Sequence, residues 1–173
     1  QAFRDPPPWA RILLVGPVLA LTFTKGLYRG DALEEWMREL LARRSVYTFS
    51  DLVLPGETDE RFRYKLQVIA ADISRGRMLV LPRDMADYGV DPDDVDVARA
   101  VRMSASLPYF YQPVTQYYPT PRGGFRSYIV DGGLLSNFPV WLFDVDGMPP
   151  WPTFGFALVS PQQGRPNRIR GPV

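Results

Sequence analysis

The pattern of apolar and polar positions divides the chain into short strands and amphipathic helices. Four apolar runs have the length of buried strands: residues 66–73, 78–81, 127–130 and 154–159. The run over residues 66–73 is nearly continuous instead of alternating, which is typical of a strand buried on both faces of a mostly parallel sheet. The pattern therefore predicts an α/β domain in which residues 66–73, 127–130 and 154–159 are neighbouring strands of one sheet.

Helical spacing is clearest over residues 31–43, which we expect to pack on that sheet. One face of this helix carries Leu33, Trp36, Met37, Leu40 and Leu41. Asp31 and Glu34 have the spacing of a capping box, with Asp in place of the usual Ser or Thr. A second helix is predicted from Asp91 to about residue 105, with proline and acids in its first turn. A short helix is expected over residues 138–143.

The two ends of the chain carry no recognisable targeting segment. Ile12 to Phe23 is apolar with one break, and we interpret it as a buried core element; the alternative is an interfacial surface that touches lipid. It is shorter than the roughly 20 residues that a membrane span needs, and no signal-peptide pattern is visible. These features predict a soluble or peripheral protein of unknown location. Residues 161–173, rich in Pro, Gly and Arg, are expected to be a loop or frayed end.

Composition excludes several kinds of chemistry. The 173 residues suffice for one domain with a core, and the net charge of +1 implies no broad field for nucleic acid. The chain has no cysteine and no histidine, which excludes thiolate nucleophiles, Ser-His-Asp catalysis and most zinc chemistry within it. Hydrolysis here must use a carboxylate, a lysine, a tyrosine or water as its base.

A cluster of acids, Asp91, Asp93, Asp94 and Asp96, raises the question of calcium. An EF-hand loop needs glycine at its sixth position and glutamate at its twelfth, and neither is present. The cluster favours a helix start over a metal site. No metal or organic cofactor is expected.

The stretch from Tyr128 to Val140 holds the strongest candidate for chemistry. A short apolar run ends on Asp131, and Gly132 and Gly133 follow at once. Glycines allow a sharp turn or a close approach of the backbone, so the strand would deliver a carboxylate to the edge where α/β sheets place their ligands. The plain alternative is a structural Asp-Gly turn.

Several stretches together resemble the C-terminal half of bacterial patatin-like phospholipases. They are Ala98 to Pro108, Phe110, Pro113-Val114, Val130-Asp131-Gly132-Gly133, Asn137 and Pro139, with Lys25 to Asp31, Thr48 to Leu52 and Ala70-Ala71-Asp72 further upstream. The resemblance is scattered over residues 25 to about 160. Its most specific part is the Asp-Gly-Gly motif with its flanks.

This resemblance implies a three-layer α/β/α fold and a serine-aspartate dyad that hydrolyses lipid acyl esters. Asp131 would be the dyad acid and general base, with Gly132 and Gly133 supporting its motif. The substrate would be a fatty-acid ester of a phospholipid or glycerolipid, with transient contact at a membrane surface and no nucleic-acid partner. The direct Ser-Asp pairing agrees with the absence of histidine.

The family's nucleophile motif, G-x-S-x-G, does not occur in these residues, and neither does a glycine-rich oxyanion loop. Ser104, Ser106 and Ser136 lie near the acid motif, but they do not match the nucleophile. We therefore expect residues 1–173 to be one domain, incomplete at its N-terminal side and inactive alone. Two alternatives are a non-catalytic lipid-binding or interaction module and an unrelated α/β protein with a plain turn.

Overall fold

The structure is a computed structural model that describes residues 25–121, 123–136, 138–149 and 151–157. The chain divides into two compact units, residues 1–137 and 138–173, each described by itself. The interpretations of Ile12 to Phe23 and of residues 161–173 lie outside the described residues.

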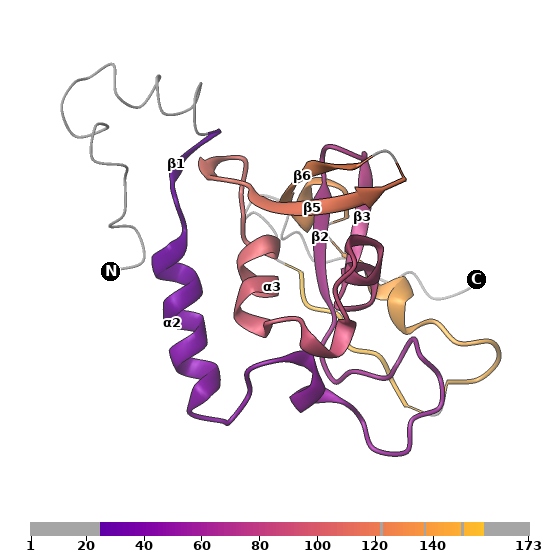
Figure 1. The fold of residues 1–173 in the computed structure, drawn as a ribbon. Coiled ribbons are helices and arrows are strands. Elements are labelled where there is room, and N and C mark those ends of the chain that lie inside the picture. The colour runs from indigo at the N-terminus through magenta and orange to yellow at the C-terminus, as the bar shows by residue number, and fades with distance from the viewer. Residues whose placement is uncertain (1–24, 122, 137, 150, 158–173) are drawn as a thin grey trace, which may run out of the picture. The chain divides into compact units, whose positions relative to one another are not determined.

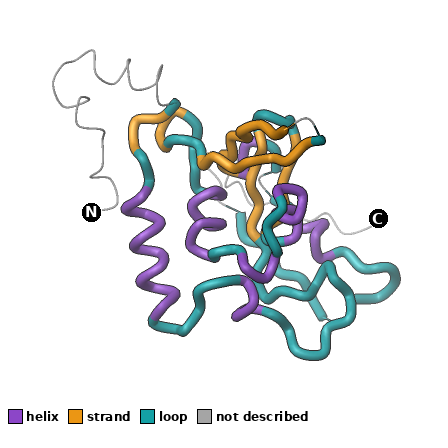
Figure 2. Tube along the Cα trace, in the orientation of Figure 1, coloured by secondary structure: helices purple, strands orange, loops and turns teal. Residues whose placement is uncertain are grey.

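The first unit contains β1 (Gly26–Tyr28), α2 (Asp31–Ala42), β2 (Val68–Asp72), β3 (Arg77–Leu81), α3 (Val97–Ser104), β4 (Tyr109–Tyr111), β5 (Val114–Thr120) and β6 (Gly123–Asp131), as Figures 1 and 2 show.

The main sheet is antiparallel, so the prediction of a mostly parallel sheet is wrong for the described residues. Its strand order is β3-β2-β6-β5, and each neighbouring pair is antiparallel. For two of the three pairs the cause is local: short connections join β2 to β3 and β5 to β6, and a short connection links only antiparallel strands. The parallel pair is β1 with β4, which form a separate two-stranded sheet. The predicted pairing of residues 66–73 with 127–130 is confirmed by β2 and β6.

The third predicted neighbour, residues 154–159, is not a strand over its described part, residues 154–157. Phe154 and Phe156 are 79% and 91% exposed. A strand needs a partner for its backbone groups, and no strand among the described residues pairs with this segment. In the same unit, Val140–Phe143 form the 3-10 helix η6 within the short helix predicted over 138–143.

The helix predicted over residues 31–43 is confirmed as α2, with two differences. Its N-cap is Gly30, in a left-handed conformation, and Asp31 is the first helical residue instead of the cap. The helix packs chiefly on α3, which itself contacts β2 and β6, so α3 lies between α2 and the sheet (Figure 1). From α2, Leu41 packs against the core.

The second predicted helix begins later than the sequence indicates. Asp91 accepts a hydrogen bond from the backbone of Asp93 and caps the short 3-10 helix η4 (Pro92–Asp94). Asp96 then accepts one from the Arg99 N–H at 2.8 Å and caps α3. Two aspartates at successive N-caps therefore divide the segment into two helices where the sequence suggested one. Upstream, a further 3-10 helix, η2, spans Phe49–Leu52.

The core lies where α3 meets the sheet. Its fully buried large side chains include Phe49, Leu79, Leu81, Val97, Met103 and Ile129. Burying a side chain of this kind contributes about 1.5–3 kcal/mol relative to leaving it exposed. This packing fixes the end of α3 against β6, and thereby the surroundings of Asp131. Within the described ranges no helix is long and apolar enough to cross a membrane.

Candidate active site

Asp131 is the last residue of β6 and is held at its backbone and at one carboxylate oxygen. Its N–H donates to the carbonyl oxygen of Ser106 at 3.0 Å, and its Oδ1 accepts from the N–H of Gly133 at 2.7 Å. The register places it opposite Ala70 of β2, on the face that packs against α3. The side chain is half-buried, and among the described residues no donor bonds Oδ2. One oxygen is therefore fixed and the other is open to a further partner.

The residue after Asp131 must be a glycine, because the backbone of β2 lies against it. A Cβ at this position would lie 2.4 Å from the carbonyl oxygen of Ile69, closer than real Cβ atoms approach. Gly132 and Gly133 begin the 3-10 helix η5 (Gly132–Leu134), whose N-cap is Asp131. The first glycine provides the close approach, and the second provides the N–H that orients the carboxylate.

An open cavity of ≈ 350 Å³ lies near the Asp131 turn. It is lined by Gln67, Val68, Ile69, Val101, Ser104 and Ala105, from the start of β2 and the end of α3. Two lining residues connect the cavity to the Asp131 turn. The carbonyl of Ile69 lies against Gly132, and Ala105 directly precedes Ser106, whose carbonyl oxygen accepts the Asp131 N–H. The lining is mostly apolar, and the volume lies within the range of ligand pockets, roughly 300–1,000 Å³.

The three serines near the motif occupy different places. Ser106 is fully buried, Ser104 lines the cavity, and the N–H of Ser136 donates to the carbonyl of Gly132 at 2.9 Å. Among the described residues no serine hydroxyl forms a hydrogen bond with the Asp131 carboxylate. The described residues thus present an acid without a nucleophile bonded to it.

Each acid considered for calcium has a structural use or faces solvent. Asp91 and Asp96 are N-caps, and Asp93 accepts bonds from the Arg63 guanidinium at 2.7 Å and the Tyr64 hydroxyl at 2.5 Å. Burial and the bond to Asp93 raise the pKa of Tyr64 to about 12. The residues that the structure describes contain no group of three or more acids that could hold a metal ion.

Arg102 is not among the site residues predicted from the sequence. Arg102 is 3% exposed, and its guanidinium donates to the hydroxyl of Ser106. An arginine in the last turn of a helix has no sequence signal that distinguishes a buried side chain from a solvated one. The contact of Arg102 with Ser106 is local, four residues along the chain, whereas the fold brings its guanidinium to the carbonyl oxygen of Arg29.

The comparisons with known proteins concern the chain as a whole. The model of the patatin-like phospholipase family matches residues 8–144. An uncharacterised protein of Bacillus subtilis (strain 168), YqhO, is 41% identical over 143 residues, which are 83% of this chain and 44% of that relative. The mixed arrangement of helices and strands agrees with an α/β patatin-like domain. The chain belongs to the patatin-like phospholipase family. It spans less than half the length of the curated relative.

Proposed function

We propose that the protein containing this chain is a lipid acyl hydrolase in which Asp131 is the general base. The observation that carries the proposal is the Asp131 carboxylate, with Oδ1 oriented by the Gly133 N–H and Oδ2 open, at a strand end near an apolar cavity. Membership of the patatin-like phospholipase family supports lipid hydrolysis.

The reaction follows from a serine paired directly with an aspartate. The carboxylate accepts the serine proton as the hydroxyl oxygen attacks the ester carbonyl carbon, and it returns that proton to the departing alcohol. An acyl-enzyme remains. Water then attacks the acyl carbon and gives a proton to Asp131, which passes it to the serine as the fatty acid leaves. Histidine has no part in either step, in agreement with its absence from the chain.

The serine and the oxyanion donors are proposed to come from parts of the protein outside these 173 residues. Two observations support this: no G-x-S-x-G motif occurs here, and the chain covers 44% of its relative. Residues 1–173 would then be one incomplete domain, and alone they would hydrolyse no ester. Losing even one oxyanion donor costs on the order of 10²–10³ in kcat.

The decisive variant is Asp131→Asn in the complete protein, assayed on a chromogenic medium-chain ester and on phospholipid. Asparagine keeps the shape but accepts no proton, so kcat should fall by about 10²–10⁴-fold with folding intact. Asp91→Asn is a matched control, because Asp91 also accepts a backbone N–H two residues on but faces solvent. Near-parental hydrolysis by a folded Asp131→Asn protein would exclude the dyad. Lipid binding without hydrolysis by the parent would favour a non-catalytic module.

Contact with the lipid surface is proposed for the segment after Ser106, which leads into and includes the start of β4. Leu107, Tyr109 and Phe110 are 53%, 75% and 37% exposed, although they lie next to the residue that bonds Asp131. Aromatic side chains suit the boundary between water and lipid. Leu107→Ser with Phe110→Ser should weaken sedimentation of the complete protein with phosphatidylcholine vesicles, whereas Tyr47→Ser, at an exposed aromatic on another segment, should not. Equal sedimentation of both variants would refute this contact.

A further inference from the structure

We infer that Arg102 is a positioning residue for Asp131, acting through Ser106. The inference rests on the proposed function, since it assigns a role in placing the proposed base. Arg102 would not touch the substrate. Its guanidinium would fix the segment whose carbonyl oxygen holds the Asp131 backbone.

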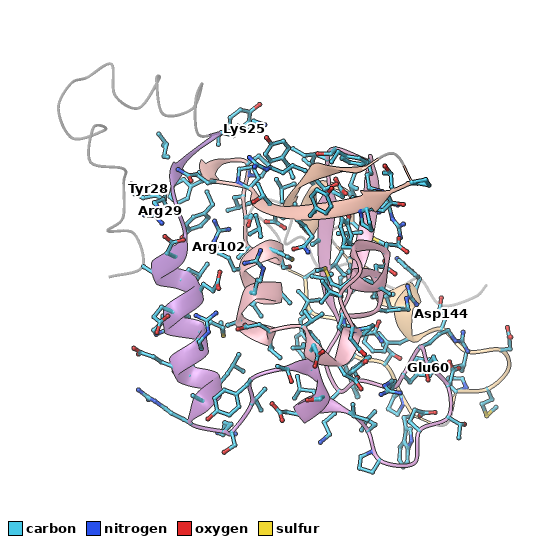
Figure 3. The ribbon with its side chains drawn as sticks, viewed as in Figure 1. Lys25, Tyr28, Arg29, Glu60, Arg102 and Asp144 are labelled. Carbon is cyan, nitrogen blue, oxygen red and sulfur yellow. The ribbon has the colours of Figure 1, made fainter. Side chains whose placement is uncertain are left out.

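The guanidinium of Arg102 joins three segments, of which the one at Arg29 is distant in sequence. Nη1 donates to the Ser106 hydroxyl, and Nη2 donates to the carbonyl oxygens of Arg29 and, at 2.8 Å, Gln112. These acceptors follow α3, β1 and β4, respectively. Figure 3 shows Arg102 on α3 on the side toward the junction of β1 and α2, where Arg29 lies. The guanidinium also lies 5.2 Å from the ring centroid of Tyr111.

Ser106 connects this cation to the acid. Its hydroxyl donates to the carbonyl of Arg102 at 2.6 Å, and its N–H donates to the carbonyl of Met103 at 3.2 Å. Its own carbonyl oxygen accepts the Asp131 N–H at 3.0 Å. Ser106 is therefore bound to Arg102 at its side chain and to Asp131 at its backbone. A shift of the guanidinium would move the carbonyl that places the base.

Gly30 leaves the room that the guanidinium occupies. A Cβ at Gly30 would lie 2.1 Å from Nε and 2.3 Å from Cζ of Arg102, and Gly30 also has a φ of +83°. Any side chain there would displace the guanidinium without removing its charge. Position 30 thus offers a second and independent way to disturb the same contact.

Arginine suits this position because its planar fork carries five donors that can reach several acceptors at once. Lysine is a single point of charge and cannot reproduce the set of bonds. Replacing Arg102 alone leaves the carbonyl oxygens of Arg29 and Gln112 without this donor, which lowers stability. A loss of turnover in Arg102→Met therefore reports positioning only in protein whose thermal unfolding shows it to be folded.

The test uses the complete protein with Arg102→Met, Arg102→Lys, Ser106→Ala and the Arg102→Met/Ser106→Ala double variant. Misplacing a catalytic group by about 1 Å can cost on the order of 10²-fold, so kcat of Arg102→Met should fall by about 10–100-fold, with KM within about threefold. Arg102→Lys should not restore it. The double variant should lose no more than Arg102→Met alone, because both changes break one contact.

Gly30→Ala should lower kcat in the same way. Its control is Gly89→Ala, which carries a similar backbone strain at φ +73° with nothing within 4 Å of the added Cβ, and should keep parental kcat. Thermal unfolding of every variant separates turnover from folding. Should Arg102→Met fail to fold, Arg102→Lys and Gly30→Ala decide the question.

Three results would overturn the inference. The first is a kcat within about twofold of the parent in a folded Arg102→Met or Arg102→Lys protein. The second is a double variant whose loss of kcat is the sum of the Arg102→Met and Ser106→Ala losses, and the third is a loss of kcat in Gly89→Ala equal to that in Gly30→Ala. The failure of the proposed function looks different. If Asp131→Asn keeps its activity, the proposed base is wrong. If Asp131→Asn is inactive while folded Arg102→Met is fully active, only the positioning role is wrong.

Discussion

At the scale of single residues, Gly132 links the site to the sheet. Its missing Cβ allows the Ile69 carbonyl to lie against the turn that orients Asp131. Gly132→Ala must push β2 and the turn apart, and overpacking of this kind costs about 1–3 kcal/mol. We expect a lower thermal unfolding midpoint and reduced ester hydrolysis in the complete protein. Parental stability and activity in this variant would contradict the described packing.

The sequence was sufficient to predict Asp131 as an acid at the end of a strand and a glycine turn after it. It was not sufficient for the surroundings of that acid. The Ser106 carbonyl reaches Asp131 from a residue 25 positions earlier in the chain, and the Arg102 guanidinium that bonds the Ser106 hydroxyl belongs to a residue 29 positions earlier. Such bonds depend on how α3 packs on β6, which no local pattern records.

At the scale of elements, local signals predicted α2 and the strands β2, β3 and β6, because helical spacing and apolar runs depend on neighbouring residues. The direction and the pairing of the strands were harder to predict from the sequence. The hairpin turns made the sheet antiparallel, and residues 154–157 did not form a strand in spite of their apolar run. Whether an apolar run forms a strand depends on which neighbouring strand is available to pair with it, and the run alone does not specify that neighbour.

The end of β2 is stabilised by a buried pair whose strength should depend on pH. The Tyr88 hydroxyl donates to Oδ2 of the fully buried Asp72 at 2.6 Å. Burial, with the bond to Asp72, raises the pKa of Tyr88 from 10.0 to about 12. A raised folded-state pKa gives stability that is complete below pH 10 and is lost as pH rises toward 12.

The free energy of unfolding should therefore decline between pH 10 and 12, and Tyr88→Phe should flatten part of that decline. Tyr64, with a similarly raised pKa, should account for a further part. Tyr118→Phe is the control, because the Tyr118 hydroxyl has no hydrogen bond in the described part of the chain. Urea unfolding at several pH values provides the comparison. An unchanged slope in Tyr88→Phe would contradict the pairing of Tyr88 with Asp72.

At the scale of the whole molecule, the chain contains the acid of a proposed dyad. Its match covers less than half of the length of the curated relative. The Gly133 N–H orients one carboxylate oxygen of Asp131. Among the described residues, no nucleophile forms a hydrogen bond with this carboxylate. The account therefore requires a serine from elsewhere in the protein, activated by Asp131.

Labelling with a fluorophosphonate, which reacts with activated serine hydroxyls, tests this requirement most directly. The complete protein, its Asp131→Asn variant and the 173-residue chain alone are treated in parallel, and the labelled peptide is identified by mass spectrometry. We predict one labelled serine in the complete protein, outside these 173 residues, with labelling greatly slowed in Asp131→Asn and absent from the chain alone. Labelling of Ser104, Ser106 or Ser136, or equally fast labelling of Asp131→Asn, would contradict the account.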